Sequence, residues 1–403
     1  MARNTGRLGV GIVVGGLLAM GATVAQRELV RRAGTQLIDW EAVRGIARRR
    51  VGAGDVRLTA DERALAERFY REALVRIEPA IAAEIGAELP AALETPVVID
   101  RREWIDLNLA TFEALFGRVE PILERSAGAA TTPGRALARI LNRSLGNQQI
   151  GFLMGFLARK VLGQYDLSLL AAGPTTRGRL HFVEPNIVAT ASALRLSLPE
   201  FRTFIALHEA THAFEFEAYP WVRGHFTALV AEAIEQLALE SGGLATRLRQ
   251  ALAGRGDGHW LERLMTPTQL ATFRRTQAFM SLLEGYSNHV MNAAGSRILP
   301  GFTQLHDRFE RRNEARTGLE RAIMRLTGLD LKMEQYVAGE RFVDTVIEQR
   351  GRAFMNRVWE GPANLPTLDE IRAPETWIAR LEGAPAPPAE SGDGQGHLPE
   401  GDR

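Results

Sequence analysis

Apolar residues recur at helical spacing along most of this chain, and strand-like patterns are short. From about residue 35 to 175 the pattern is mostly helical, most clearly at residues 62–83. Short strands are predicted at residues 96–100 and 179–188, and helix is expected to continue from 225 to about 382. The pattern therefore predicts a mostly α fold of the α+β class, with a small β element just before a long helix.

The long helix that begins near residue 197 is the best-marked element. Residues 197–200 read Ser-Leu-Pro-Glu, which is typical of a capping box with proline in the first turn. Helical spacing then continues to near Tyr219, where the following Pro220 disfavours helix in the residue before it. Residues in the middle of this helix are therefore expected to be held rigidly.

An HExxH motif, His-Glu-Ala-Thr-His, occupies residues 208–212 in the middle of that helix. His208 and His212 are four residues apart, so both imidazoles lie on one helix face and can bind one metal ion. Glu209 is turned away from the metal but can reach a water bound to it, as in zinc hydrolases. The alternative is a chance match between two ordinary, partly buried histidines, which the helical context disfavours.

A catalytic zinc ion usually has three protein ligands and one water. The metzincin pattern is absent, because Glu215 and Ala218 stand where its glycine and third histidine would be. Two glutamates remain as candidates for the third ligand. Glu232 follows His212 by twenty residues but sits in a generic amphipathic pattern, whereas Glu284 follows an apolar turn. We favour Glu284 and keep Glu232 as the alternative.

Two residues close after Glu284 are candidates for a catalytic role. Tyr286 and His289 each carry a group that can donate a hydrogen bond to a developing oxyanion. Each also fits an ordinary position in a helical core, and the sequence leaves both interpretations open.

Composition narrows the chemistry further. With 49 basic and 48 acidic residues, the chain lacks the basic excess typical of nucleic-acid binding. The absence of cysteine excludes disulfides, thiol nucleophiles and thiolate ligands. Any zinc must therefore be held by histidine and carboxylate, which favours a catalytic site over a structural one.

The two ends of the chain differ from its middle. Residues 8–25 are apolar and uncharged, with arginines on both sides, which favours a membrane-associated segment in residues 1–34. A signal peptide, or a glycine-rich helix packed on a cytoplasmic protein, is the alternative. Residues 383–403 are rich in proline, glycine and acidic residues and are expected to be disordered. A single domain is expected over residues 35–382.

Several blocks of sequence, taken in order, resemble a known protein family. The blocks are residues 161–166, 182–187, 208–221, 284–290, 311–316 and 326–331. Over about residues 38–375 they are similar to a family of zincin-like proteins described as zinc-dependent metalloproteases or hydrolases. Some members of that family are associated with the biosynthesis of a deazaflavin coenzyme.

This resemblance implies a mostly helical zincin-like domain that binds Zn²⁺ through His208, His212 and Glu284. It also implies that Glu209 is the base, which would accept a proton from a zinc-bound water and pass it to the leaving amine. We expect a peptide or protein substrate, with other amides as further candidates. The alternative from another class is a catalytically inactive protein that keeps the zincin fold for binding or scaffolding.

Overall fold

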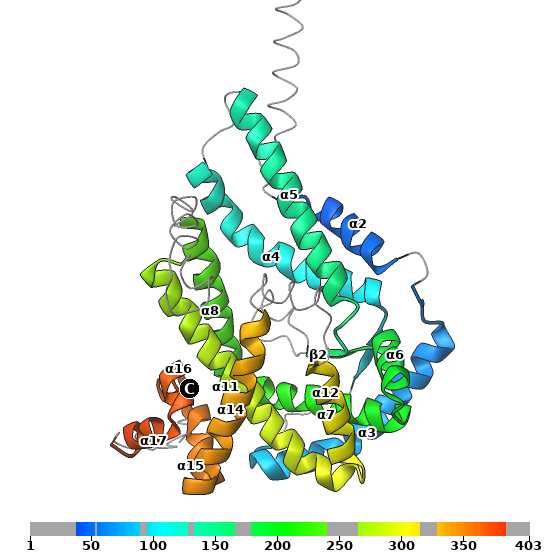
Figure 1. Ribbon diagram of the computed structural model, residues 1–403, viewed down its shortest axis with the longest axis vertical. Helices are drawn as coiled ribbons and strands as arrows, with labels where there is room; N and C mark the ends of the chain where they lie inside the picture. Colours follow the sequence, from blue (N-terminus) through cyan, green and yellow to red (C-terminus); the bar gives the residue numbers. More distant parts are fainter. Residues whose placement is uncertain are drawn as a thin grey trace, which may run out of the picture.

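The computed structural model describes residues 38–52, 55–88, 95–127, 133–165, 179–239, 265–314 and 329–383 (Figure 1). This part of the chain is mostly helical with one small sheet, which confirms the predicted α+β class. The segment predicted to associate with a membrane, residues 8–25, and the tail from residue 384 onward lie outside it. Among the described helices, none combines the length and hydrophobicity that crossing a lipid bilayer requires.

Long helices make up most of the molecule. In chain order they are α2 (Trp40–Val51), α3 (Ala60–Ile85), α4 (Arg101–Ala127), α5 (Pro133–Leu157), α6 (Glu184–Leu194), α7 (Leu198–Glu217), α8 (Pro220–Leu239), α11 (Pro267–Ile298), α12 (Phe302–Glu314) and α14 (Leu329–Arg350). Short helices follow: α15 (Arg352–Met355), the 3-10 helices η2 (Asn356–Glu360) and η3 (Pro362–Asn364), α16 (Leu368–Arg372) and α17 (Pro374–Gly383).

The small sheet has the strand order β1-β3-β2, formed by β1 (Val97–Ile99), β2 (Gly163–Tyr165) and β3 (Leu180–Val183). β1 runs parallel to β3, whereas β2 runs antiparallel to it and forms an edge that packs against α7. The strand predicted at residues 179–188 was too long. It ends at Val183 because Pro185, in the first turn of α6, starts a helix there, and α6 connects the sheet to α7 along the chain.

Helix α7 has nearly the predicted ends, since it begins at Leu198 and ends at Glu217. The predicted capping box was wrong, because the side chain of Ser197 forms no capping hydrogen bond. Pro199, the second helical residue, has no N–H to donate, and the N–H of Glu200, the third, does not bond to the serine either. The proline that marks the start of the helix therefore removes one of the donors that a capping serine would use.

The main hydrophobic core surrounds α7 and holds it between α3, α8 and α11. Phe201, Leu207 and Phe214 of α7 are fully buried in it. α11 in turn packs along α14 (Figure 1). The two backbones approach closely at Gly285 and Gly339. Burial on most sides fixes the position of α7 relative to α11, and these two helices carry the site described next.

Candidate metal centre

Helix α7 presents the two histidines of the motif on one face. Their rings lie 4.8 Å apart between centroids and are nearly perpendicular, at 87°. Both side chains are half-buried, although most of the residues around them on α7 are buried. The spacing of four residues therefore has the predicted result, with two imidazoles one helical turn apart on the same side.

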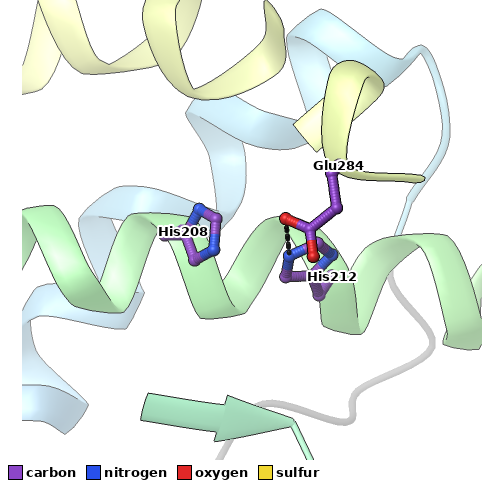
Figure 2. Close-up of side chains that lie close together, drawn as sticks. All are labelled: His208, His212 and Glu284. Carbon is purple, nitrogen blue, oxygen red and sulfur yellow. Dashed lines mark ion pairs between the residues drawn. The ribbon is translucent and has the colours of Figure 1, made fainter. Parts of the chain in front are cut away.

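Helix α11 brings Glu284 to this pair. Oε2 of Glu284 lies 3.6 Å from Nε2 of His212, and Figure 2 shows the carboxylate pointing from α11 toward α7. One donor atom from each of His208, His212 and Glu284 lies within 4.8 Å of the others. The side chains of His212 and Glu284 are 15% and 16% exposed, so the cluster is not sealed from solvent. The structure thus gathers the three predicted ligands from two helices.

The other candidate for the third ligand, Glu232 of α8, lies in a different setting. Its Oε1 accepts hydrogen bonds from Arg275, Thr272 and Gln236, at distances of 2.5 to 3.0 Å. It is not part of the group of side chains around His208 and His212. Through these contacts Glu232 links α8 to α11. The geometry therefore favours Glu284, rather than Glu232, as the third ligand.

The donor set suits a divalent metal of the zinc type, because two imidazoles and one carboxylate are common ligands of catalytic zinc. Burial, with help from the charge on His212, lowers the pKa of His208 to about 4. His208 is therefore neutral near pH 7 and keeps a lone pair available. Burial also acts to lower the pKa of His212, but hydrogen bonds with Glu215 and Glu284 outweigh it and raise that pKa. Without a metal, a proton on His212 compensates the two carboxylates, and a cation can replace it.

Glu209 lies on the buried side of this cluster and is only 7% exposed. Burial is the main reason that its pKa rises to about 7, and the backbone N–H of Tyr165 in β2 opposes that rise by bonding to the carboxylate. Gly163 of the same strand packs against the Glu209 side chain. A carboxylate with a pKa near the working pH can both accept and return a proton, so Glu209 has the properties of a general base.

Tyr286 and His289 each bond to a neighbouring element. The Tyr286 hydroxyl donates a hydrogen bond to Oδ1 of Asn356 (2.8 Å), and the ring is almost fully buried. Nδ1 of His289 lies 2.6 Å from Oδ1 of Asp344 on α14. Both contacts connect α11 to the elements beside it. The geometry favours a packing role for both residues, and their role at an oxyanion stays a prediction.

The structure also reveals a residue that the sequence reasoning missed. Oε2 of Glu215 lies 2.9 Å from Nδ1 of His212, on the opposite side of the ring from the nitrogen that faces Glu284. The signal in the sequence is the spacing of three residues, which puts Glu215 one turn after His212. From the sequence alone, position 215 stands out only as the place where the metzincin pattern has glycine.

Comparisons with known proteins agree with this arrangement. Residues 38–378 match the family described as zincin-like metallopeptidase. A crystal structure from Chloroflexus aurantiacus, described as a candidate hydrolase with a novel fold, is similar to this chain, with 42% identity and a TM-score of 0.65. The similarity covers 86% of this chain and 100% of that one. The comparison with curated proteins found no match. Because the family match extends over most of its length, the chain belongs to the zincin-like metallopeptidase family.

Proposed function

We propose that this protein is a zinc-dependent metallopeptidase that hydrolyses peptide bonds. The observation that carries the proposal is the meeting of His208, His212 and Glu284, with the buried carboxylate of Glu209 on the same helix. The family supports hydrolysis by a metal site, and its description supports a peptide as the substrate. The hydrolase description of the Chloroflexus aurantiacus structure points to the same class of reaction.

His208, His212 and Glu284 are the residues that would hold the zinc ion. When bound, zinc supplies a Lewis acid and lowers the pKa of a coordinated water toward neutrality. The carboxylate of Glu209 takes up the proton that the attacking water loses, and a nearby cation keeps that carboxylate in the charged form that can accept it. The same carboxyl group then delivers the proton to the leaving amine, which must be protonated to depart.

The helical framework supplies the positioning that this chemistry needs. His208 and His212 are fixed by the burial of α7, and Glu284 is fixed by the packing of α11 on α7 and α14. Glu209 is held by strand β2, where the backbone N–H of Tyr165 donates a hydrogen bond to its carboxylate. Groups held this way lose little orientation entropy in the reaction.

The test combines metal analysis with peptide hydrolysis by the purified full-length chain. We expect one zinc per chain in the wild type and none after His208→Ala together with His212→Ala. Glu209→Gln should keep the zinc and lose hydrolysis of a mixed peptide library by a factor of about 10² or more, since removing a positioned base costs that much. Cleavage in H₂¹⁸O should place ¹⁸O in the new carboxyl termini.

Glu232→Gln is the matched control, because this glutamate contacts Arg275 and Thr272 rather than the histidines. It should leave both zinc content and hydrolysis unchanged. Zinc binding with no hydrolysis of any peptide or amide would instead support the inactive, scaffolding alternative. Hydrolysis that survives in Glu209→Gln would show that another group acts as the base.

A further inference from the structure

The carboxylate of Glu215 is buried in direct contact with one of the two histidines. Its side chain is 1% exposed, and its Oε2 lies 2.9 Å from Nδ1 of His212. The second oxygen, Oε1, is buried and has no hydrogen-bond partner among the described residues. Burying a carboxylate is costly unless a charged or strongly polarised partner compensates it. His212 is that partner in this structure, so the contact explains why a charged residue occupies this core position.

The direction of the contact excludes a role for Glu215 as a ligand of the same ion. The two nitrogens of an imidazole point to different sides of the ring. Nδ1 of His212 faces Glu215, whereas Nε2 faces Glu284 at 3.6 Å. Once a cation replaces the second proton on His212, the hydrogen bond from Nδ1–H to the carboxylate leaves the lone pair on Nε2 free to bind it. Glu215, which lies on the same helix as His212, therefore keeps a proton on Nδ1 and determines which tautomer binds the metal.

Two tyrosines within electrostatic reach of this carboxylate pack against Trp359. Tyr219 stacks on Trp359 with the ring centroids 5.0 Å apart, and Tyr286 meets the same tryptophan edge-on, also at 5.0 Å. Both tyrosines lie near enough to Glu215 for its charge to add to the effect of burial in raising their pKa values. In such surroundings the attraction between Glu215 and the imidazole is weakly screened.

We propose that Glu215 is a positioning residue, which fixes the tautomer and orientation of His212 and strengthens it as a metal ligand. This inference rests on the proposed function, because it needs a metal bound at Nε2 of His212. It goes further in assigning a role to a side chain outside the HExxH motif. A carboxylate behind a metal-binding histidine typically contributes a factor of 10 to 100 in metal affinity.

The experiment measures zinc affinity by competition with a chromophoric chelator, on the full chain and its variants. Glu215→Gln keeps the size of the side chain but removes its charge, and we expect zinc to bind about 10-fold more weakly. Glu215→Ala also removes the hydrogen bond, and a loss of about 100-fold is expected. The absorption spectrum of the Co²⁺-substituted protein should change in both variants, because the orientation of one ligand changes.

Glu184→Gln is the matched control. Glu184 is another buried carboxylate, 3% exposed, but it bonds to Arg202 and Tyr70 rather than to a histidine. It should lower the free energy of unfolding while leaving zinc affinity and the Co²⁺ spectrum unchanged. Circular dichroism of each metal-free variant establishes that it is folded before metal is added.

The outcomes separate the two proposals. If the wild type binds zinc tightly and both Glu215 variants bind it equally well, the positioning role is wrong and the proposed function stands. An equal loss of affinity in Glu184→Gln would also overturn the role, since the effect would then come from general destabilisation. If the wild type binds neither zinc nor Co²⁺, the proposed function fails and the role of Glu215 fails with it.

Discussion

Gly163 packs directly against the side chain of Glu209. A Cβ atom at position 163 would lie 2.5 Å from Cγ and 2.6 Å from Oε1 of Glu209, closer than atoms in a folded protein can approach. Two residues later in the same strand, the N–H of Tyr165 bonds to the Glu209 carboxylate. Strand β2 therefore confines the proposed base by a close contact and by a hydrogen bond.

Gly163→Ala should displace Glu209, because the three atoms nearest to the added methyl group all belong to this side chain. Its methyl group has to push the carboxylate away, and a displacement of about 1 Å in a reacting group can reduce the rate about 10²-fold. We expect peptide hydrolysis to fall by about this factor while the zinc content stays at the wild-type level. The measurement is kcat with zinc analysis of the same sample.

Gly224→Ala provides the control for this substitution. Gly224 lies in α8 with nothing within 4 Å of a Cβ at that position. Alanine there should preserve activity and add about 0.5–1 kcal/mol to the free energy of unfolding, because glycine is unfavourable inside a helix. Full activity of Gly163→Ala would mean that Glu209 is not confined by β2.

Gly339 allows α11 and α14 to pack closely behind Glu284. A Cβ at position 339 would lie 1.9 Å from the carbonyl oxygen of Ser281, which is backbone and cannot turn aside. Gly339→Ala should therefore separate the helices and lower the free energy of unfolding by about 1–3 kcal/mol. Zinc affinity should also fall, because α11 carries Glu284. Urea unfolding and zinc competition measure the two effects, and wild-type values for both would contradict this account.

The sequence predicts the histidines of the candidate metal site better than it predicts the residues around them. Two histidines four residues apart on one helix need no long-range information, because helical periodicity alone puts them together. Glu284 comes from a helix 72 residues later, and the chain pattern left it in competition with Glu232. Only the packing of α11 on α7 distinguishes the two candidates. It brings Glu284 to His212, whereas Glu232 lies beside Arg275.

Strand β2 shows why the rest could not be predicted. It has three residues, including Gly163 and the polar Gln164, so neither alternation nor β-branched residues mark it. It forms because β3 offers an edge to pair with, a tertiary contact that local propensity does not encode. The same reasoning applies to Glu215, whose importance depends on which nitrogen of His212 it meets.

Tyr286→Phe and His289→Ala test whether these residues act in catalysis. Each loses a hydrogen bond between α11 and a neighbouring element, to Asn356 or to Asp344. We expect each to lower the free energy of unfolding by about 1 kcal/mol and to change kcat less than about 2-fold. A fall in kcat of about 10² or more, with unchanged stability, would instead identify the residue as an oxyanion donor.

The raised pKa of Glu209 predicts how the stability of the metal-free protein depends on pH. Burial raises this pKa from 4.5 to about 7, so between these values the folded state binds more protons at Glu209 than the unfolded state. The contribution of Glu209 to stability is therefore fully present below pH 4.5 and is lost as pH rises through 7. A pKa difference of about 2.5 corresponds to at most about 3 kcal/mol, at about 1.36 kcal/mol per unit.

Glu209→Gln removes this titration and leaves the other ionisable groups of the cluster in place. In urea unfolding with a chelator present, the variant should gain stability relative to the wild type as pH rises from 4.5 to 7, and the difference should then level off. Excess zinc should flatten the difference, because a nearby cation favours the charged carboxylate and lowers its pKa. A difference that is constant between pH 4.5 and 8 without metal would show that Glu209 has an ordinary pKa and that burial does not raise it in the folded protein.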